Sequence, residues 1–324
     1  MSQDYLISII IPTYNRADII DDTLKSIQVQ THKKWECIVV DDGSTDHTEE
    51  LLNAYIHKDE RFSYVKRPEH LPKGANACRN YGFELSKGDY INWFDSDDVM
   101  LPKKLETQIK ALLEFKKSPY CVSQTRWKNK INGKDFGLRS RYLDSKNRLE
   151  DYILYNSYWS ILAPLWRRDF LIENNLKFDT SLHQSQEYDF HINALKASDN
   201  YVITDEVLSI MYEHDTNVSV DIYTNNFKIE SNLTVKERVT KHHLFRFTTS
   251  GQLKWLEILT LYFKTLLIHK KTTFAKKTIP LIFSTLKEVD ISSVRKLLFK
   301  IKIILAYISF VLIGKGYTLV KPLT

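Results

Sequence analysis

We expect the chain of 324 residues to fold as an α/β protein with a doubly wound, mostly parallel sheet, and three observations predict it. Strand-like apolar runs alternate with segments of helical apolar spacing from residue 6 to about residue 115, which is typical of sheets covered by helices on both faces. Three of these runs end in polar or acidic segments. The composition then changes near residue 220, where a basic, helix-like region begins.

The first two strands are predicted at residues 6–11 and 35–40. A helix follows the first strand, because Ile19, Ile20, Leu24 and Ile27 recur at helical spacing. After the second strand, Gly43 permits a tight turn, and Asp46 and Glu49 have the spacing of a capping box for the next helix. Capping leaves Asp41 and Asp42 unexplained, so we expect this pair to be available to a ligand.

The third strand, predicted at residues 90–94, is bounded by Gly88 and Pro102 and lies in the most acidic segment. Carboxylates crowded at a strand end repel one another unless a cation neutralises them. Mg²⁺ or Mn²⁺ suits such oxygen ligands, and magnesium completes its shell with water and substrate phosphates. The alternative is that Ser96, Asp97 or Asp98 caps the helix after Pro102. Four of the ten residues 89–98 are acidic: Asp89, Asp95, Asp97 and Asp98.

In a doubly wound sheet, ligands bind beyond the carboxyl ends of the strands, so the three polar segments should line one cleft. The chain has no Gly-x-Gly-x-x-Gly after its first strand and no Gly-x-x-x-x-Gly-Lys-Ser/Thr, and it contains only 9 glycines. A glycine-rich phosphate cradle is therefore excluded. A metal held by strand-end carboxylates and bridging to a diphosphate is the remaining route.

Four segments at natural spacings together resemble the consecutive motifs of family 2 nucleotide-sugar glycosyltransferases of the GT-A fold. The segments are residues 8–16 (SIIIPTYNR), 40–46 (VDDGSTD), 77–80 (ACRN) and 95–98 (DSDD). The resemblance covers roughly residues 5–215. It implies that Asp42 accepts a hydrogen bond from the base and that Asp97 or Asp98 binds the metal. The other implied nucleotide and donor residues are Pro12, Thr13, Tyr14, Arg16, Asp41, Arg79, Asn80, Asp95 and Ser96.

The second half of the motif set supplies the expected catalytic base. Residues 178–182 and 186–190 resemble the family's second signature, with Glu187 where relatives carry a catalytic aspartate and Asp189 as the alternative base. Both acids could instead lie in the exposed first turn of a helix, where negative charge is favourable. By the same resemblance, His214 lies near the diphosphate and metal.

The expected acceptor side comprises Tyr158, Trp159 and Trp166, because aromatic faces pack well on sugar rings; core packing explains such residues equally well. Between the two halves, residues 120–139 alternate around Asn132-Gly133, which predicts an antiparallel hairpin. This antiparallel portion would extend the parallel sheet on the acceptor side.

Charge divides the chain into two expected domains, residues 1–220 and residues 221–324. From Asn225 onward there are 18 Lys and Arg against 5 Asp and Glu, whereas the preceding residues carry 28 and 35. Helical apolar spacing with interspersed lysines predicts amphipathic helices on an anionic membrane surface. The uncharged run 303–313 is shorter than the ~20 residues of a spanning helix. A bundle with a solvated lysine face is the alternative, and nucleic acid is not an expected partner.

These features lead to one expectation for the whole chain. It is a hexosyltransferase-type enzyme that moves a sugar from a nucleotide donor, expected to be UDP-linked, to a glycan or lipid-linked acceptor with Mn²⁺ or Mg²⁺. Three scattered cysteines and the absence of a signal-like N-terminus predict a cytoplasmic protein, peripheral on the inner face of the membrane. A sugar-phosphate nucleotidyltransferase and a non-catalytic nucleotide-sugar-binding module are the alternatives.

Overall fold

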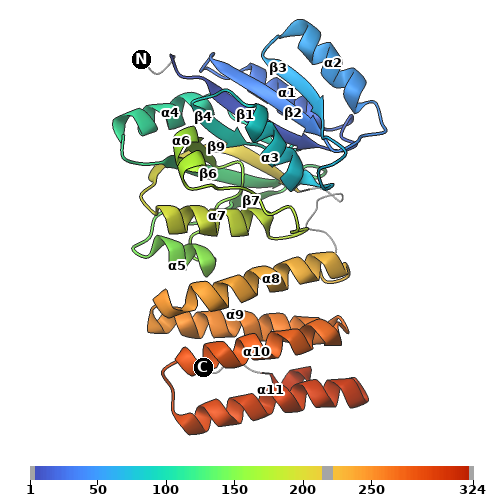
Figure 1. Cartoon of the computed structure of the whole chain (residues 1–324), viewed down its shortest axis with the longest axis vertical. Helices are drawn as coiled ribbons and strands as arrows, with labels where there is room; N and C mark the ends of the chain where they lie inside the picture. The colour runs from blue at the N-terminus through green and yellow to red at the C-terminus, as the bar shows by residue number, and fades with distance from the viewer. Residues whose placement is uncertain (1–3, 214–221, 321–324) are drawn as a thin grey trace. The chain divides into compact units, whose positions relative to one another are not determined.

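The structure, a computed structural model, describes residues 4–213 and 222–320. It divides into two compact units, Met1–Thr180 with Gln186–Asn217 and Ser181–Ser185 with Val218–Thr324. The first is an α/β unit and the second a helical unit (Figure 1). The expectation that residues 1–220 and 221–324 act as separate functional domains stays a prediction.

The α/β unit is built on a mixed sheet of nine strands among the described residues, in the order β3-β2-β1-β4-β8-β6-β9-β5, with β7 paired to β6. Strands β3, β2, β1 and β4 are parallel, and β8 is antiparallel to both β4 and β6. The strands are β1 (Ile7–Thr13), β2 (Trp35–Asp41), β3 (Phe62–Lys66), β4 (Tyr90–Trp93), β5 (Val99–Met100), β6 (Tyr120–Asn129), β7 (Asp135–Leu138), β8 (Pro164–Arg167) and β9 (Val202–Glu213).

Helices connect the strands and cover the sheet (Figure 1). Helix α3 lies so close to the sheet that a Cβ on its Gly82 would be 2.4 Å from the Cγ2 atom of Ile10 in β1. A larger side chain at residue 82 would force the packing of α3 on β1 and β2 to change. The helices of this unit are α1 (Ile20–Gln28), α2 (Thr48–Lys58), α3 (Ala75–Leu85), α4 (Lys104–Glu114), α5 (Arg148–Ile153), α6 (Arg168–Glu173) and α7 (Gln186–Ala197).

Most of the predicted elements are confirmed. The apolar runs are β1, β2 and β4, and the hairpin around Asn132-Gly133 is β6 with β7, where Gly133 has a φ of 69°. The predicted capping box is wrong, because the Glu49 carboxylate forms an ion pair with Lys66 instead of accepting a hydrogen bond from the Asp46 N–H. Asp46 still bonds the first amide of α2, that of Thr48.

The helical unit contains α8 (Asn226–His242), α9 (Thr249–Ile268), α10 (Thr272–Glu288) and α11 (Ser293–Ile313), with short 3-10 turns η2 (Leu244–Arg246) and η3 (Tyr317–Leu319). Figure 1 shows the four long helices stacked in chain order. A basic helical region in this part of the chain is therefore confirmed. Over the described residues, none of the helices combines the length and apolarity needed to cross a membrane.

Candidate active site

The carboxyl ends of β1, β2 and β4 lie at one edge of the sheet. The register pairs Thr13 with Asp41 and Ile10 with Trp93, so the polar segments that follow these strands are neighbours. Asp89 does not belong with them, because it precedes β4 at the opposite edge and accepts a hydrogen bond from the Leu6 N–H at 2.9 Å. The acidic cluster at the end of β4 therefore consists of Asp95, Asp97 and Asp98.

The loop after β1 is fixed by the loop after β2. Asn15, at a φ of 50°, donates its N–H to the Ser44 hydroxyl at 2.8 Å and accepts the Thr45 N–H at 2.8 Å. The Arg16 N–H donates to the Thr48 hydroxyl at 3.0 Å. These bonds leave the adjacent Tyr14 side chain 52% exposed. An exposed aromatic ring on a rigid loop is suited to lining a ligand pocket.

Asp41, expected from the sequence to contact a ligand, is held within the α/β unit. Its carboxylate is buried and accepts hydrogen bonds from the Ser44 N–H at 3.0 Å and from the Tyr64 hydroxyl at 2.8 Å. Both oxygens are therefore engaged in holding the β2 turn against β3. The burial of Asp41 and these hydrogen bonds favour a structural role for it in the β2 turn.

Asp42 organises a second loop. Its carboxylate accepts a hydrogen bond from Arg67 and one from the Gly74 N–H at 2.8 Å. Arg67 also donates to the carbonyl oxygens of Pro68, at 2.9 Å, and Leu71. A carboxylate has about four acceptor positions, so Asp42 keeps capacity for a base. Arg67 was missed in the sequence, although the alternating run 62–66 before it could have indicated a strand end.

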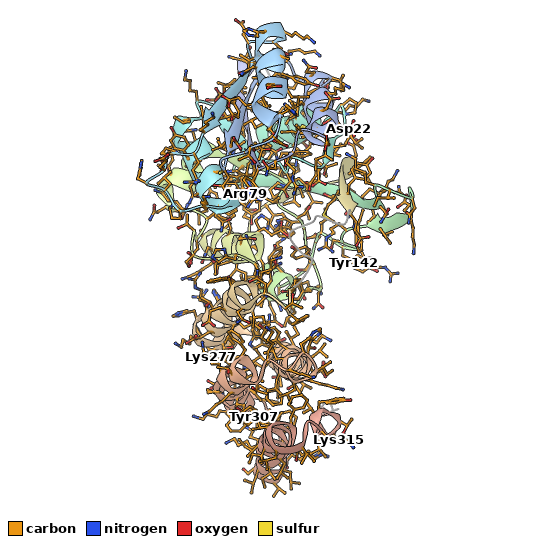
Figure 2. All side chains as sticks on the ribbon, turned by 90° about the vertical axis from the view of Figure 1, so that its right-hand side faces the viewer. Asp22, Arg79, Tyr142, Lys277, Tyr307 and Lys315 are labelled. Atoms are coloured by element: carbon orange, nitrogen blue, oxygen red, sulfur yellow. The ribbon has the colours of Figure 1, made fainter. Side chains whose placement is uncertain are left out.

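Arg79 lies between the nucleotide-side loops and the acidic cluster. Its buried guanidinium donates to Asp95 at 2.8 Å and to the Asn76 side chain at 3.3 Å. Burial raises the pKa of Asp95, while Arg79 and the more distant Arg16 lower it. Arg79 is therefore paired with Asp95, and the charge of Arg16 also acts on this carboxylate. Figure 2 marks Arg79 within the α/β unit.

Asn80 has a structural role. Its side-chain amide donates to the Phe178 carbonyl at 2.9 Å and accepts the Phe178 N–H at 3.0 Å. Its neighbour on α3, Asn76, donates to the Asp179 carbonyl at 2.7 Å. Both asparagines therefore fix the segment that leads toward α7, and the amide of Asn80 is already occupied.

Asp98 is a buried carboxylate among like charges. Its Oδ1 accepts the Tyr212 N–H at 2.8 Å, and its backbone carbonyl accepts the Thr23 hydroxyl at 2.7 Å. Burial raises its pKa well above the ordinary value, and the charges of Asp97 and Asp95 raise it further. The alternative capping role is wrong: α4 begins after Lys103, where the cap has no side-chain hydrogen bond. Ser96 is buried beside these acids.

Glu187, in the first turn of α7, faces the same cluster. Its carboxylate accepts hydrogen bonds from the Tyr158 hydroxyl and from the Ile161 N–H at 2.7 Å. Burial raises the pKa of Glu187, the Tyr158 bond lowers it, and the charge of Asp95 raises it. The alternative of an exposed helix-terminal acid is wrong for Glu187, because two donors hold its carboxylate and burial raises its pKa.

A cation near Glu187 was missed in the sequence. The Arg139 guanidinium lies 5.0 Å from the centre of the Tyr158 ring, and its charge lowers the pKa of Glu187. Arg139 follows the β7 strand, where nothing in the local pattern marked it. Asp189, the alternative base, is also buried, and Asn193 on the next turn donates to it at 3.4 Å.

Two of the three expected acceptor-side residues are wrong. Trp159 is 1% exposed and Trp166 is fully buried, because both belong to the aromatic core behind the sheet. Trp166 packs against the Tyr120 ring at 4.3 Å and lies in β8, which pairs with β4. Tyr158 alone remains beside the site, through its contact with Glu187.

The described residues contain no group of three or more His, Cys, Asp or Glu side chains that could hold a metal ion. Asp97 and Asp98 still fit a metal shared with substrate, because Mg²⁺ usually takes one or two protein carboxylates and fills its shell with water and phosphates. The repulsion that raises the pKa of Asp98 is the observation that favours a cation there. His214 lies outside the described residues.

Comparisons with known proteins show the family and the fold of the chain. The family model "Glycosyl transferase family 2" matches residues 8–171. TuaG of Bacillus subtilis, named as a teichuronic acid biosynthesis glycosyltransferase, is 42% identical over 34% of this chain and 42% of its own length. YibD of Escherichia coli, an uncharacterized glycosyltransferase, is 29% identical over 68% of this chain and 64% of its own. The matched region thus spans less than two thirds of either relative.

Among solved structures, the chain is similar to S. aureus TarS residues 1–349 in complex with UDP-GlcNAc, with a TM-score of 0.57 and 18% identity over 86% of this chain and 90% of that one. A likeness at this identity shows a common GT-A fold. The fold and the family model, which spans half of the sequence, agree, and the chain belongs to glycosyl transferase family 2.

Proposed function

We propose that this protein transfers a sugar from a nucleoside diphosphate sugar to a hydroxyl group of a glycan or lipid-linked acceptor. The observation that carries the proposal is the position of Glu187, whose carboxylate is held by hydrogen bonds from Tyr158 and Ile161 and whose pKa is raised by burial and by the charge of Asp95 in the acidic cluster after β4. A general base beside a donor-binding cluster is what direct displacement requires. This arrangement argues against a module that only binds nucleotide sugars.

The proposed reaction is a single displacement with inversion. Glu187 takes the proton of the acceptor hydroxyl as its oxygen bonds to the anomeric carbon, and the bond to the nucleoside diphosphate breaks. The raised pKa of Glu187 brings this carboxylate closer to neutral pH than an ordinary glutamate, which suits a base that must receive a proton. Asp189 is the second candidate for this role.

The donor is held by the edge formed by β1, β2 and β4. Tyr14 and Asp42 are the proposed contacts of the base, and Arg79 and Asp95 those of the ribose and sugar. Asp97 and Asp98 would hold Mn²⁺ or Mg²⁺, which supplies charge stabilisation to the departing diphosphate. A uridine donor is supported by the fold shared with TarS, which was solved with UDP-GlcNAc and with UDP. A cell-envelope acceptor is supported by the name of TuaG.

Release of free nucleoside diphosphate from a panel of nucleotide sugars with Mn²⁺ tests the proposal. We expect release from at least one UDP-sugar, accelerated by acceptor, and a loss of about 10²–10⁴-fold in kcat for Glu187→Gln. Asp189→Asn changes the other carboxylate in the first turn of α7 and should reduce kcat far less. No release from any donor would overturn the enzyme proposal, and a large loss only in Asp189→Asn would move the base to that residue.

A further inference from the structure

Helix α11 exposes a continuous apolar face, although it is a long helix in the folded helical unit. Its buried side, which includes Phe299, Ile303 and Ala306, packs in the unit, where α11 contacts α10. On the other side, nine aliphatic residues recur at spacings of three and four, and each is 37–75% exposed. This face, called here the α11 face, consists of Val294, Leu297, Leu298, Ile301, Ile304, Leu305, Ile308, Val311 and Leu312.

The α11 face is wide and uninterrupted. At about 100° per residue, its members cover an arc of ~140° around the helix, and the only polar residue of α11 on that arc is Ser293, at its edge. Soluble proteins seldom leave a patch of this kind without a partner. The side chains of this last long helix are drawn in Figure 2, which labels Tyr307 on it and Lys315 just beyond its end.

Cations flank the α11 face on both sides. On the helical projection, Arg295 and Lys302 follow one edge of the arc and Lys300 follows the other, whereas the Lys296 ammonium donates to the Lys287 carbonyl of α10 at 2.8 Å. The helix carries no aspartate or glutamate between Ser293 and Ile313. The partner must therefore bring both an apolar surface and negative charge to its margins.

We propose that the α11 face is a docking surface for an anionic lipid bilayer, on which the helix lies in the plane of the interface. Burial of the nine aliphatic side chains among acyl chains and contact of the flanking cations with lipid phosphates satisfy both requirements. The α11 face also repeats every seven residues, as in Leu298, Leu305 and Leu312, and such a repeat would suit packing against a second copy of this chain. Packing two copies face to face, however, would bring cations near cations with no carboxylate from α11 to neutralise them.

Membrane docking rests on the proposed function for its meaning and deepens it. An enzyme bound to the bilayer would share the membrane surface with a lipid-linked acceptor. The test of membrane docking needs no catalysis. The full chain is sedimented with vesicles of phosphatidylcholine alone and with vesicles of equal parts phosphatidylcholine and phosphatidylglycerol. We expect strong binding only to the second kind, weakened by salt as surface charges are screened.

Substitutions on the exposed side separate the two components. Ile301→Gln with Leu305→Gln should reduce vesicle binding by about tenfold or more, and so should Lys300→Gln with Lys302→Gln. The matched control is Leu261→Gln with Ile268→Gln, which changes two residues of α9 that are 65% and 50% exposed. This control should bind vesicles like the unaltered chain. Circular dichroism and thermal unfolding confirm that each variant is folded.

Three results would overturn the proposal. One is an unaltered chain that does not bind either kind of vesicle. Another is equal loss in the α9 control. The third is a stable oligomer that Ile301→Gln with Leu305→Gln dissociates, without vesicle binding, which would assign the face to a second copy. Diphosphate release without vesicles remains measurable in every variant, so failure of membrane docking is distinguishable from failure of the proposed enzyme.

Discussion

The two units of the chain depart in opposite ways from the usual distribution, in which charged groups are exposed and apolar groups are buried. The α/β unit buries charge, with Asp98 only 2% and Arg79 8% exposed, whereas the helical unit exposes hydrocarbon, with Leu312 75% exposed. Either departure costs free energy in the isolated protein. Each therefore indicates a place where a partner completes the structure.

The difference between the two places lies in geometry. Every buried carboxylate described at the strand edge has a fixed partner, as Asp98 has in the Tyr212 N–H and Glu187 in the Ile161 N–H. The α11 face has area and flanking charge but no directed group. A metal and a diphosphate require ligands at fixed positions, whereas a bilayer requires only an apolar surface with charged margins. The strand edge can therefore select one ligand, whereas the α11 face cannot.

The largest stability effect should come from breaking the Arg79–Asp95 pair. Arg79→Met leaves the carboxylate of Asp95 without the guanidinium that lowers its pKa. Because Asp95 keeps a side-chain exposure of 33%, we expect a loss of about 2 kcal/mol rather than the full cost of a buried charge. Urea unfolding at neutral pH measures it.

The double variant Arg79→Met with Asp95→Asn is the control for that measurement. It removes both charges and should recover most of the lost stability, without recovering nucleotide binding. An unchanged midpoint in the single variant would mean that the pair is screened by solvent and that the α/β unit does not depend on paired burial of charge.

A buried charge outside the site offers the next comparison. Burial lowers the pKa of Lys104 to about 7, and its ammonium donates to the Ala163 carbonyl at 3.2 Å. Between pH 7 and the unfolded value of 10.5 the folded protein binds fewer protons than the unfolded one, so Lys104 makes stability rise with pH. Lys104→Met should stabilise the protein by about 1–2 kcal/mol at pH 6 and by less at pH 9.

Gln108 continues to donate to the Ala163 carbonyl in Lys104→Met, so no acceptor is left unpaired. Denaturant unfolding at both pH values checks the prediction. Equal gains at pH 6 and pH 9 would show that Lys104 does not titrate in this range.

Asp98→Asn should separate stability from function in the acidic cluster. Burial and the neighbouring carboxylates disfavour the charged form, so at neutral pH the carboxylate opposes folding, whereas an amide keeps Oδ1 as the acceptor for Tyr212. Without metal, we expect the Tm of the variant to exceed that of the unaltered protein by about 2–4 °C at pH 8 and by less at pH 5. Addition of Mn²⁺ should no longer change the Tm of the variant. A lower Tm at pH 8 would contradict the repulsion.

The smallest expected effect is a shift in pH dependence from Tyr158→Phe. The Tyr158 hydroxyl lowers the pKa of Glu187, so removing this hydroxyl raises that pKa. Because the base works when ionised, the fall of activity on acidification then begins at a higher pH. The acid limb of kcat/KM should move upward by less than about one unit. Tyr142→Phe, at a ring 59% exposed, is the matched control. A downward shift would exclude Glu187 as the base.

The sequence predicted those parts of the site that depend on local pattern. Apolar runs ending in acids placed Asp42, Asp95 and Asp98 at one sheet edge, because parallel register follows from the alternation of strands and helices. The sequence could not show that the Asp41 carboxylate accepts hydrogen bonds from Ser44 and Tyr64, because these bonds depend on how the β2 turn packs against β3.

Residues contributed by long-range packing were also beyond the sequence. The alternating run 62–66 indicates a strand end before Arg67 but not its partner Asp42, and nothing in the local pattern marks Arg139 as a charge that lowers the pKa of Glu187. Trp159 and Trp166 show the converse, because aromatic composition suggested a sugar surface where tertiary packing made a core. Burial of a large side chain is decided by its neighbours in space, which a one-dimensional pattern does not specify.

The proposed function depends on strand-end carboxylates that hold a divalent cation bound to the donor diphosphate. Calorimetric titration of the full chain with UDP, with Mn²⁺ and then with EDTA, tests it most directly, alongside the variant Asp97→Asn with Asp98→Asn. We predict Mn²⁺-dependent binding that EDTA and the double variant both abolish. Equal UDP affinity under all these conditions would contradict this proposal.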